Sequence, residues 1–343
     1  MIEASHWHPV ALAESVTDHP VAVTLLEQAV VLWRGEVGIV HAWADQCPHR
    51  GARFSLGKVI GGKLECGYHG WQFASSGQCV FVPAMPAFTA PATHCARRFQ
   101  AREAYGLIWV CIGGPNAGSA NTGSVFELPS FAAESDAALY KLNCGPYDVA
   151  TSAPRVVENF LDMAHFGFVH EGWLGSRPTA TSTASTTISD YLVEPTATGL
   201  VATNCKAWQP RSNVHSTAPA QVEYRYEVTA PYCALLTKEP DPASVALANF
   251  RESIGLFVCP LTSESSRVWF RLAVAHTELN RASDDKLRDF QHTIFMQDKP
   301  ILESQQPKRL PLDLQAERHT AADKASSAYR RHLAGLGITF GVC

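Results

Sequence analysis

Short runs of apolar residues separated by turn signals dominate the first third of the chain. The runs at 21–26, 29–33 and 39–43 are too short for helices and are rich in β-branched and aromatic residues, so they predict β-strands. Residues 34–38 hold two glycines and are expected to form the turn before the third strand. A further apolar run at 106–112 predicts another buried strand. The first third therefore reads as all-β.

A stretch rich in Gly, Asn and Ser at 113–124 is the best linker candidate in the chain. We therefore expect one domain at 1–124 and a second at 125–343. In the second part, residues 221–228 alternate apolar and polar side chains and predict a half-exposed strand. The more apolar run at 267–275 predicts another strand.

Helix signals appear late in the chain. Ser283, followed by two acidic residues, predicts an N-cap, and the apolar positions after it predict a helix that Pro300 should disturb. A final helix is predicted over 321–333, with Gly335 as its stop. Strands followed by mixed strands and helices indicate an α+β fold.

Composition narrows the possible functions. The 343 residues are 46% hydrophobic and 17% charged, with a net charge of −4, which argues against a nucleic-acid partner. We find no run of eighteen apolar residues that would predict a transmembrane helix, and no signal-peptide pattern at the start. Most of the ten cysteines follow no regular spacing, which is typical of reduced thiols in a cytoplasmic protein.

Two fragments carry the clearest chemistry, and each pairs one cysteine with one histidine. Cys47 and His49 form the first pair, Cys66 and His69 form the second, and sixteen residues separate the pairs. Two thiolates and two imidazoles in this arrangement are the ligand pattern of a Rieske [2Fe–2S] cluster. Imidazole brings less negative charge than thiolate, so such a cluster has a higher reduction potential than an all-cysteine one and can relay single electrons.

A structural zinc site is the alternative interpretation, because two cysteines and two histidines are a common zinc set. Zinc fingers, however, usually pair Cys with Cys and His with His. Mixed pairs suit two irons that have different ligands. Gly51 and Gly70, which follow the pairs, would let the backbone approach a cluster closely.

A second candidate metal site lies at 159–170. His165 and His170 are five residues apart, and Gly167 between them suggests that a helix loosens there so that both imidazoles can converge. Asp162, three residues before His165, could accept a hydrogen bond from its ring and fix the tautomer. Two histidines and one carboxylate form the facial triad of non-haem Fe(II) oxygenases, although on its own such a pair is more often two core histidines.

The third ligand must come from elsewhere in the chain, and Asp298 and Glu303 are the candidates. Asp298 is preferred because it lies beside Pro300, where the chain could turn a side chain inward. An electron-relay cluster needs an acceptor, which makes a second iron site more credible than it would be alone.

Three blocks together resemble the Rieske non-haem iron oxygenases, the family of ring-hydroxylating oxygenase α subunits. The first block is Cys-Pro-His-Arg-Gly at 47–51 together with Cys-Gly-Tyr-His-Gly-Trp at 66–71. The second is Asn-x-x-Asp-x-x-His-x₄-His at 159–170, and the third is the segment 298–305. The chain's length and the third block look like the monooxygenase and demethylase branch, which includes vanillate and dicamba O-demethylases and methylxanthine N-demethylases. Gln297 departs from the family, whose members often carry an acid there.

The resemblance implies a Rieske domain followed by a helix-grip-like catalytic domain built on an antiparallel sheet. It implies a [2Fe–2S] cluster and a mononuclear Fe(II) that has His165, His170 and Asp298 as ligands, with Asn159 close by. It also implies a head-to-tail homotrimer, in which Asp162 bridges His165 to His69 of a neighbouring subunit. The partners would be a small-molecule substrate, O₂, and a reductase acting directly or through a ferredoxin.

Two questions remain open at this point. A Rieske electron carrier with an accessory domain is the rival function, and iron content would distinguish it from an oxygenase. The substrate is not readable, nor is the choice between hydroxylation and demethylation of an aromatic or heterocyclic compound. Variable pocket residues are expected between about 175 and 260. Four residues near the second metal site could line an apolar pocket, but most of them are expected to serve as core: Phe160, Met163, Phe166 and Phe168.

Overall fold

The computed structural model describes most of the chain, in two units. The described residues are 1–113, 126–179, 186–211, 213–214, 216, 218–240, 251–275 and 283–343. The units are Met1–Leu128 and Pro129–Cys343. Apart from Gly113, the predicted linker lies outside the described residues.

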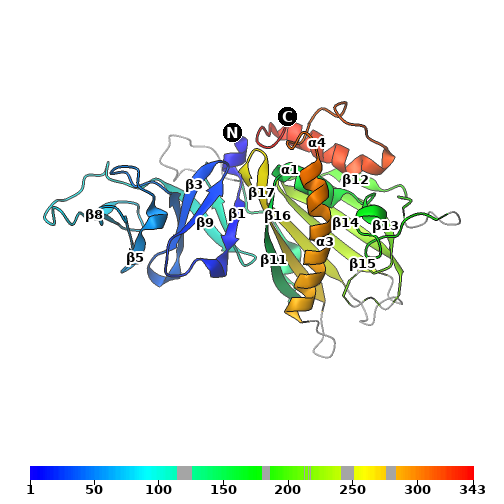
Figure 1. Cartoon of the computed structure of the whole chain (residues 1–343), viewed down its shortest axis with the longest axis horizontal. Coiled ribbons are helices and arrows are strands. Elements are labelled where there is room, and N and C mark those ends of the chain that lie inside the picture. The colour runs from blue at the N-terminus through cyan, green and yellow to red at the C-terminus, as the bar shows by residue number, and fades with distance from the viewer. Residues whose placement is uncertain are drawn as a thin grey trace. The chain divides into compact units, whose positions relative to one another are not determined.

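The first unit is built on a six-stranded antiparallel sheet (Figure 1). Its strands, in spatial order, are β1 (His8–Leu12), β10 (Leu107–Cys111), β9 (Arg98–Ala104), β4 (Val40–Ala44), β3 (Gln28–Arg34) and β2 (Val21–Leu25). The four strands expected from sequence in this region are confirmed as β2, β3, β4 and β10, each end within one residue. Alternating and continuous apolar runs are therefore sufficient to find this sheet.

The first Cys/His fragment lies in the chain between β4 and a smaller antiparallel sheet of four strands, and the second fragment joins two strands of that sheet. It runs in the order β5 (Lys58–Ile60), β6 (Lys63–Glu65), β7 (Gln72–Phe73) and β8 (Cys79–Phe81). Beneath the fragments, the buried Trp43, Phe54, Leu64 and Phe73 pack into one cluster that also includes both cysteines. Such close packing gives the loops a rigid base.

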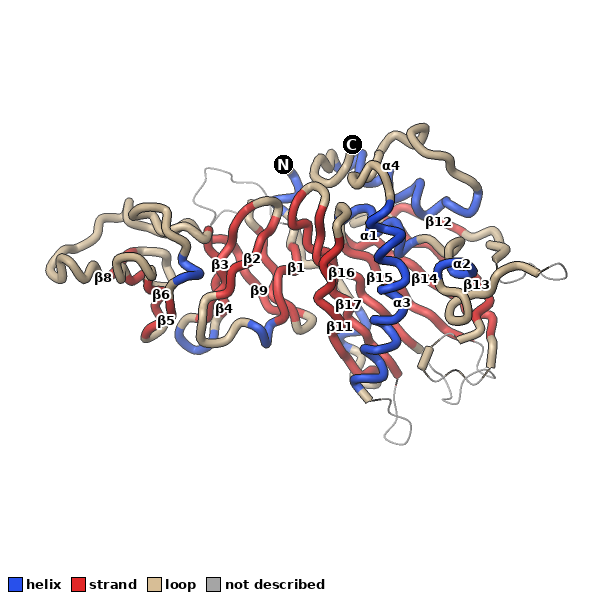
Figure 2. Tube along the Cα trace, in the orientation of Figure 1, coloured by secondary structure: helices blue, strands red, loops and turns tan. Residues whose placement is uncertain are grey.

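The second unit is built on a seven-stranded antiparallel sheet, shown face-on in Figure 2. Its strands, in spatial order, are β11 (Leu139–Val149), β17 (Ser265–Ala275), β16 (Glu252–Thr262), β15 (Cys233–Pro240), β14 (Ala220–Ala230), β13 (Leu200–Gln209) and β12 (Leu192–Pro195). The strands predicted at 221–228 and 267–275 are confirmed as parts of β14 and β17. Along β14 buried and exposed residues alternate, which shows that one face of the sheet is covered.

Helices cover that sheet on one side. α1 (Ala153–Leu161) packs on β15, β16 and β17, and the long α3 (Asp284–Ser304), orange in Figure 1, packs on β11 and α1. The other helices are α2 (Phe166–Val169) and α4 (Lys324–Leu336), and the 3₁₀ turns are Ile2–Ser5, Ala13–Ser15, Glu36–Gly38, Phe54–Leu56, Ala132–Ser135 and Ala321–Asp323. No helix in the described ranges is long and apolar enough to cross a membrane.

Two helix ends differ from the sequence predictions. Ser283 does cap α3, accepting a hydrogen bond from Lys286 N–H, but the helix continues past Pro300 to Ser304. Packing of the fully buried Leu302 outweighs the local cost of the proline. α4 ends at Gly337 rather than Gly335, because Gly337 is the residue in the left-handed conformation, at φ 72°.

The α+β prediction is confirmed: a β-rich N-terminal domain precedes a domain of antiparallel sheet and helices.

Candidate metal centres

The two Cys/His fragments fold into matching loops. In each loop the cysteine N–H donates to the carbonyl five residues on, and the glycine four residues on donates its N–H back to the cysteine carbonyl. The pairs are Cys47 with Ala52 at 2.8 Å and Gly51 at 2.9 Å, and Cys66 with Trp71 at 2.9 Å and Gly70 at 3.0 Å. Both glycines have positive φ, 74° and 68°, a conformation that favours glycine. The glycines therefore shape the turns that present the ligands.

The loops hold their cysteines inside and their histidines outside. Cys47 and Cys66 are buried, whereas His69 is exposed and His49 is half-buried and stacked on Trp71 at 4.3 Å. The two imidazole rings lie 4.7 Å apart between centroids. A Rieske cluster would need two thiolates on one iron and two imidazoles on the other, and the buried cysteines and outer histidines suit this division.

The chemistry of the donors fits a cluster. Burial raises the pKa of Cys47 to about 12, so without bound cations this thiol would stay protonated. Among the described residues, the four Cys and His side chains do not form a group whose ligand atoms converge within 4.8 Å, as a single zinc would need. Ligands shared between two irons need not converge in this way.

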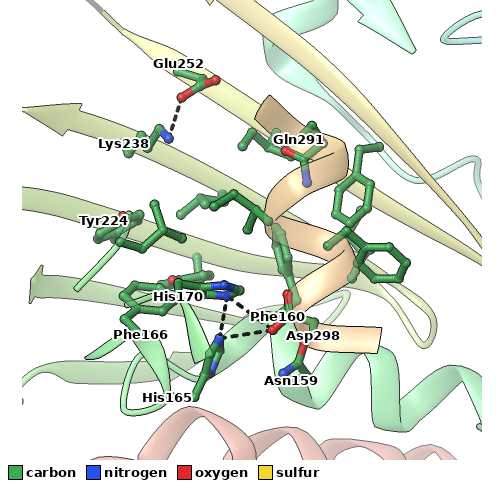
Figure 3. Close-up of a pocket in the computed structure, with 18 of the residues that line it drawn as sticks. Asn159, Phe160, His165, Phe166, His170, Tyr224, Lys238, Glu252, Gln291 and Asp298 are labelled. Carbon is green, nitrogen blue, oxygen red and sulfur yellow. Dashed lines mark hydrogen bonds and ion pairs between the residues drawn. The ribbon is translucent and has the colours of Figure 1, made fainter. Parts of the chain in front are cut away.

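The second centre does converge on a single point. His165, His170 and Asp298 each offer one ligand atom, and these atoms lie within 4.8 Å of one another (Figure 3). The two Nε2 atoms are 3.2 Å apart, and Asp298 Oδ1 lies 3.5 Å from His165 Nε2 and 3.2 Å from His170 Nε2. Three ligand atoms at right angles and about 2.1 Å from one ion would be about 3.0 Å apart. The spacing therefore fits one face of an octahedral ion.

The placement of protons explains why these atoms need a cation. His165 Nδ1 lies 3.0 Å from Asp162 Oδ2, and His170 Nδ1 lies 2.8 Å from Gln297 Oε1. Both partners are acceptors, so each ring carries its proton on Nδ1 and its lone pair on Nε2. Asp298 Oδ1 is buried and accepts no hydrogen bond from the described residues. In these tautomers two lone pairs and a carboxylate oxygen face one another, an arrangement that a bound metal ion would stabilise.

The pKa shifts of the residues around the three ligand atoms also favour a bound cation. Burial lowers the pKa of His165, but Asp162 and Asp298 more than offset this effect and raise the pKa above its ordinary value. Burial would raise the pKa of Asp162, yet the hydrogen bond from His165 holds it below its ordinary value. The carboxylates therefore favour positive charge between the histidines.

Local structure brings Asp162 to His165 in an unexpected way. A spacing of three residues would place both on one face of a continuous helix, but α1 ends at Leu161 and Asp162 has an extended backbone, with ψ 133°. The chain turns at once, and Asp162 Oδ1 accepts a hydrogen bond from Ala164 N–H at 2.7 Å, which leaves Oδ2 for His165. The break in the helix is therefore at Asp162 and not at Gly167.

Gly167 has a different role, which is close packing. A Cβ at this position would lie 2.8 Å from Ser176 O, and one at Gly175 would lie 2.6 Å from Gly167 N. The two glycines let the chain after His170 pass directly against α2. This contact supports the turn that carries both histidines.

A pocket opens onto the three ligands (Figure 3). About 710 Å³ of space not filled by atoms lies within it, a figure that includes the part open to solvent. Its walls are mostly apolar and aromatic and come from α1, α2, α3 and the sheet. The lining residues include Val156, Asn159, Phe160, Phe166, Leu174, Tyr224, Tyr226, Leu236, Lys238, Glu252, Ile254, Leu256, Phe270, Phe290, Gln291, Ile294 and Phe295.

The structure separates the sequence candidates. Asp298 lies beside the histidines, whereas Glu303 accepts hydrogen bonds from Ala150 N–H at 2.9 Å and Lys299 Nζ at 2.8 Å. Phe160 and Phe166 line the pocket, contrary to the expectation that they serve mostly as core. Met163 is buried outside it, and Phe168 is exposed.

Sequence reasoning missed two features of the site. Gln297 was noted only as a departure from the family, and its contact with His170 depends on how α3 lies against α2. Lys238 and Glu252 line the pocket from neighbouring strands, and only their position in the interval 175–260 pointed toward them.

Comparisons with known proteins identify the same two kinds of domain. A family model described as the vanillate O-demethylase oxygenase C-terminal domain matches residues 149–337, and a Rieske [2Fe-2S] domain model matches residues 6–97. The chain is 39% identical over 246 residues to the probable methylxanthine N7-demethylase of Pseudomonas sp. (strain TJI-51), which covers 70% of this chain and 78% of that one. It is 32% identical to the methylxanthine N1-demethylase of Pseudomonas putida, over 96% and 88% of the two chains.

Among solved structures, the caffeine complex of the Pseudomonas putida CBB5 protein NdmA superposes with a TM-score of 0.78 at 27% identity, covering 96% of this chain and 89% of that one.

Proposed function

Because the chain belongs to the Rieske non-haem iron oxygenases, with a vanillate O-demethylase-type C-terminal domain, we propose that it is a terminal oxygenase that removes a methyl group from an N-methylated heterocycle. Its cofactors are a Rieske [2Fe–2S] cluster and a mononuclear iron. The two relatives named as methylxanthine demethylases support an N-methyl substrate. The oxygenase domain argues against the rival function of a pure electron carrier.

The observation that carries this proposal is the convergence of two Nε2 lone pairs and a buried carboxylate oxygen at the floor of an apolar pocket. We assign His165, His170 and Asp298 as the iron ligands. Three protein ligands leave positions open for O₂ and keep the substrate close by. We assign Cys47, His49, Cys66 and His69 as the cluster ligands.

When bound, the iron supplies O₂ activation: one oxygen atom goes to the methyl carbon and the other leaves as water, with the uptake of two electrons and two protons. A hydroxylated N-methyl group then falls apart to formaldehyde and the free N–H. The chain's own residues position the reactants. Asp162 and Gln297 hold the imidazole tautomers, and the aromatic walls exclude water and orient the ring. Asn159 lines the pocket from α1 and is assigned a place beside the iron.

The proposal is tested by single turnover. Chemically reduced, iron-replete protein is mixed with ¹⁸O₂ and matched N-methyl, O-methyl and unmethylated ring compounds, and the products are identified by mass. We expect formaldehyde and the N-demethylated product in equal amounts. A labelled alcohol without formaldehyde would contradict demethylation.

One variant distinguishes the role of the mononuclear iron from that of the cluster. His165→Ala should keep the visible absorption of the cluster and lose all product formation, because the mononuclear iron loses a ligand. Iron content should fall from about three to about two per subunit. If this variant still oxidises substrate, the ligand assignment is wrong.

We further propose a homotrimer in which Asp162 meets His69 of the next subunit. Both side chains support this role, because His69 is exposed and Asp162 is only partly buried. Light scattering should then give three times the chain mass of 37.3 kDa. A monomeric mass in the active preparation would contradict it.

A reductase, acting directly or through a ferredoxin, is proposed to supply the electrons. All ten cysteines lie in the described residues and form no disulfide, which supports work in the reducing cytoplasm. We assign the Rieske domain to 1–124 and the catalytic domain to 125–343.

A further inference from the structure

A buried ion pair lies in the wall of the pocket. Lys238 Nζ and Glu252 Oε2 are 2.6 Å apart, and their side chains are only 5% and 7% exposed. The two residues are direct cross-strand partners on β15 and β16, and both line the pocket. In Figure 3 the pair lies at one end of the lining and the three iron ligands lie at the other. The pocket therefore has an iron end and a charged end.

The pair lies in a mostly apolar wall, and Lys238 Nζ is also 5.9 Å from the centroid of the Phe290 ring. Its neighbours in the same wall, Leu236, Ile254 and Leu256, are apolar. Two buried charges lose their hydration, and replacing such a pair with apolar residues of similar size is often neutral or stabilising. A charged spot in an otherwise apolar ligand pocket is instead typical of a group that fixes the orientation of the ligand.

The two charges define which ligand can sit against them. A carboxylate ligand would be attracted by Lys238 but repelled by Glu252, and a cationic ligand would meet the reverse. An ammonium presents three N–H donors, and the contact with Lys238 occupies only part of the roughly four acceptor sites of the Glu252 carboxylate. A neutral edge with a carbonyl acceptor next to an N–H donor complements both at once.

We propose that Lys238 and Glu252 form a recognition site for a neutral lactam or imide edge of the substrate, with Lys238 donating to a ring carbonyl and Glu252 accepting from the adjacent ring N–H. This inference rests on the proposed function, since it names the substrate class of the same pocket. The edge at the charged end would direct the opposite side of the ring, with its N-methyl group, toward the iron ligands. The substrate is then a partly methylated heterocycle that keeps at least one N–H.

Theobromine and caffeine are the matched probes. They differ only at N1, where theobromine has a hydrogen between two carbonyls and caffeine has a methyl group. Binding to the anaerobic holoprotein is measured by calorimetry, with vanillate as an anionic aromatic control. We expect theobromine to bind at least about tenfold more tightly than caffeine, because the N1 methyl group of caffeine replaces the N–H that would donate to Glu252. Vanillate should bind more weakly than theobromine.

Variants connect the preference to the pair. In Lys238→Met/Glu252→Leu the theobromine preference should fall to about twofold or less, while caffeine binding is kept. If that variant loses its cluster absorption or does not fold, the milder Glu252→Gln serves instead, and it should also reduce the preference. Glu227→Gln is the matched control, because Glu227 pairs with Arg225 on β14 and alternates with the pocket-lining Tyr224 and Tyr226. It should keep the wild-type ratio.

The results also separate this inference from the proposed function. Equal binding of the two xanthines, tighter binding of vanillate, no xanthine binding at all, or a preference that survives removal of the pair would each overturn the inference. Formaldehyde released in single turnover together with any of those results would leave the demethylase intact. A pair-dependent theobromine preference with no formaldehyde would support the recognition site and contradict the demethylase.

Discussion

Gln297→Leu should weaken binding of the mononuclear iron without touching the cluster. The His170 side chain is 1% exposed, and its Nδ1–H donates to Gln297 Oε1 at 2.8 Å. Leucine has a similar size but no acceptor, so the N–H would be left buried and unpaired. An unsatisfied buried donor costs about 1–3 kcal/mol.

The cost of the unpaired N–H applies only to the tautomer of His170 that can bind a metal, which carries its proton on Nδ1. With its proton on Nε2 instead, His170 could donate to Asp298 Oδ1, which is 3.2 Å away. This alternative protonates the very nitrogen that the iron needs. A bias of about 1–3 kcal/mol between the tautomers corresponds to a loss of roughly 5- to 150-fold in iron affinity.

The assay is competition between the protein and a chelator for Fe(II) under anaerobic conditions, with the visible absorption of the cluster followed in parallel. The cluster loops belong to the first unit, Met1–Leu128, so their absorption should not change. Gln297→Glu is the matched control, because it keeps an acceptor at the same position and should hold iron at least as tightly as the wild type. If Gln297→Leu binds iron as tightly as Gln297→Glu, the tautomer argument is refuted.

Three further changes test other contacts. Burial lowers the pKa of His8 from 6.5 to about 4, so the neutral ring contributes fully to stability above pH 6.5 and this contribution is lost as the pH falls toward 4. Relative to His8→Gln, the wild type should lose on the order of 3 kcal/mol of folding stability between pH 6.5 and 4. Melting temperatures of both proteins, measured across this pH range, test this. Arg330→Met should destabilise the fold by about 3–5 kcal/mol in urea unfolding, because it leaves the buried Glu158 carboxylate without its bidentate partner. Asp162→Asn should keep both metal centres but slow reoxidation of the cluster by substrate and O₂, measured by stopped flow; an unchanged rate would exclude Asp162 from the electron path.

The sequence is most informative at the two Cys/His loops, because the information that shapes them is local. Each cysteine lies two or three residues before its histidine, and a glycine with positive φ follows the histidine within two residues. The identity of the family, its α+β fold and its cofactors followed from these loops together with the block at 159–170.

The geometry of the second centre was predictable only in part. The residue types at 165, 170 and 298 suggested a triad, but the reasons given for their convergence were wrong. The break at Asp162 comes from a side chain that bonds to Ala164 N–H in preference to continuing the helix. Asp298 reaches the histidines from within a continuous helix and not from a disturbance at Pro300.

The charged end of the pocket could not be predicted because it depends on strand register. Tyr224 on β14 pairs with Lys238 on β15, which pairs with Glu252 on β16, so one rung of the sheet carries all three into the pocket wall. A shift of a single residue would turn Lys238 to the opposite face and separate it from Glu252. No local pattern marks a register set by three strands together. Iron ligands are limited to a few residue types and are therefore visible in sequence, whereas the residues that choose the substrate become visible only once the sheet is built.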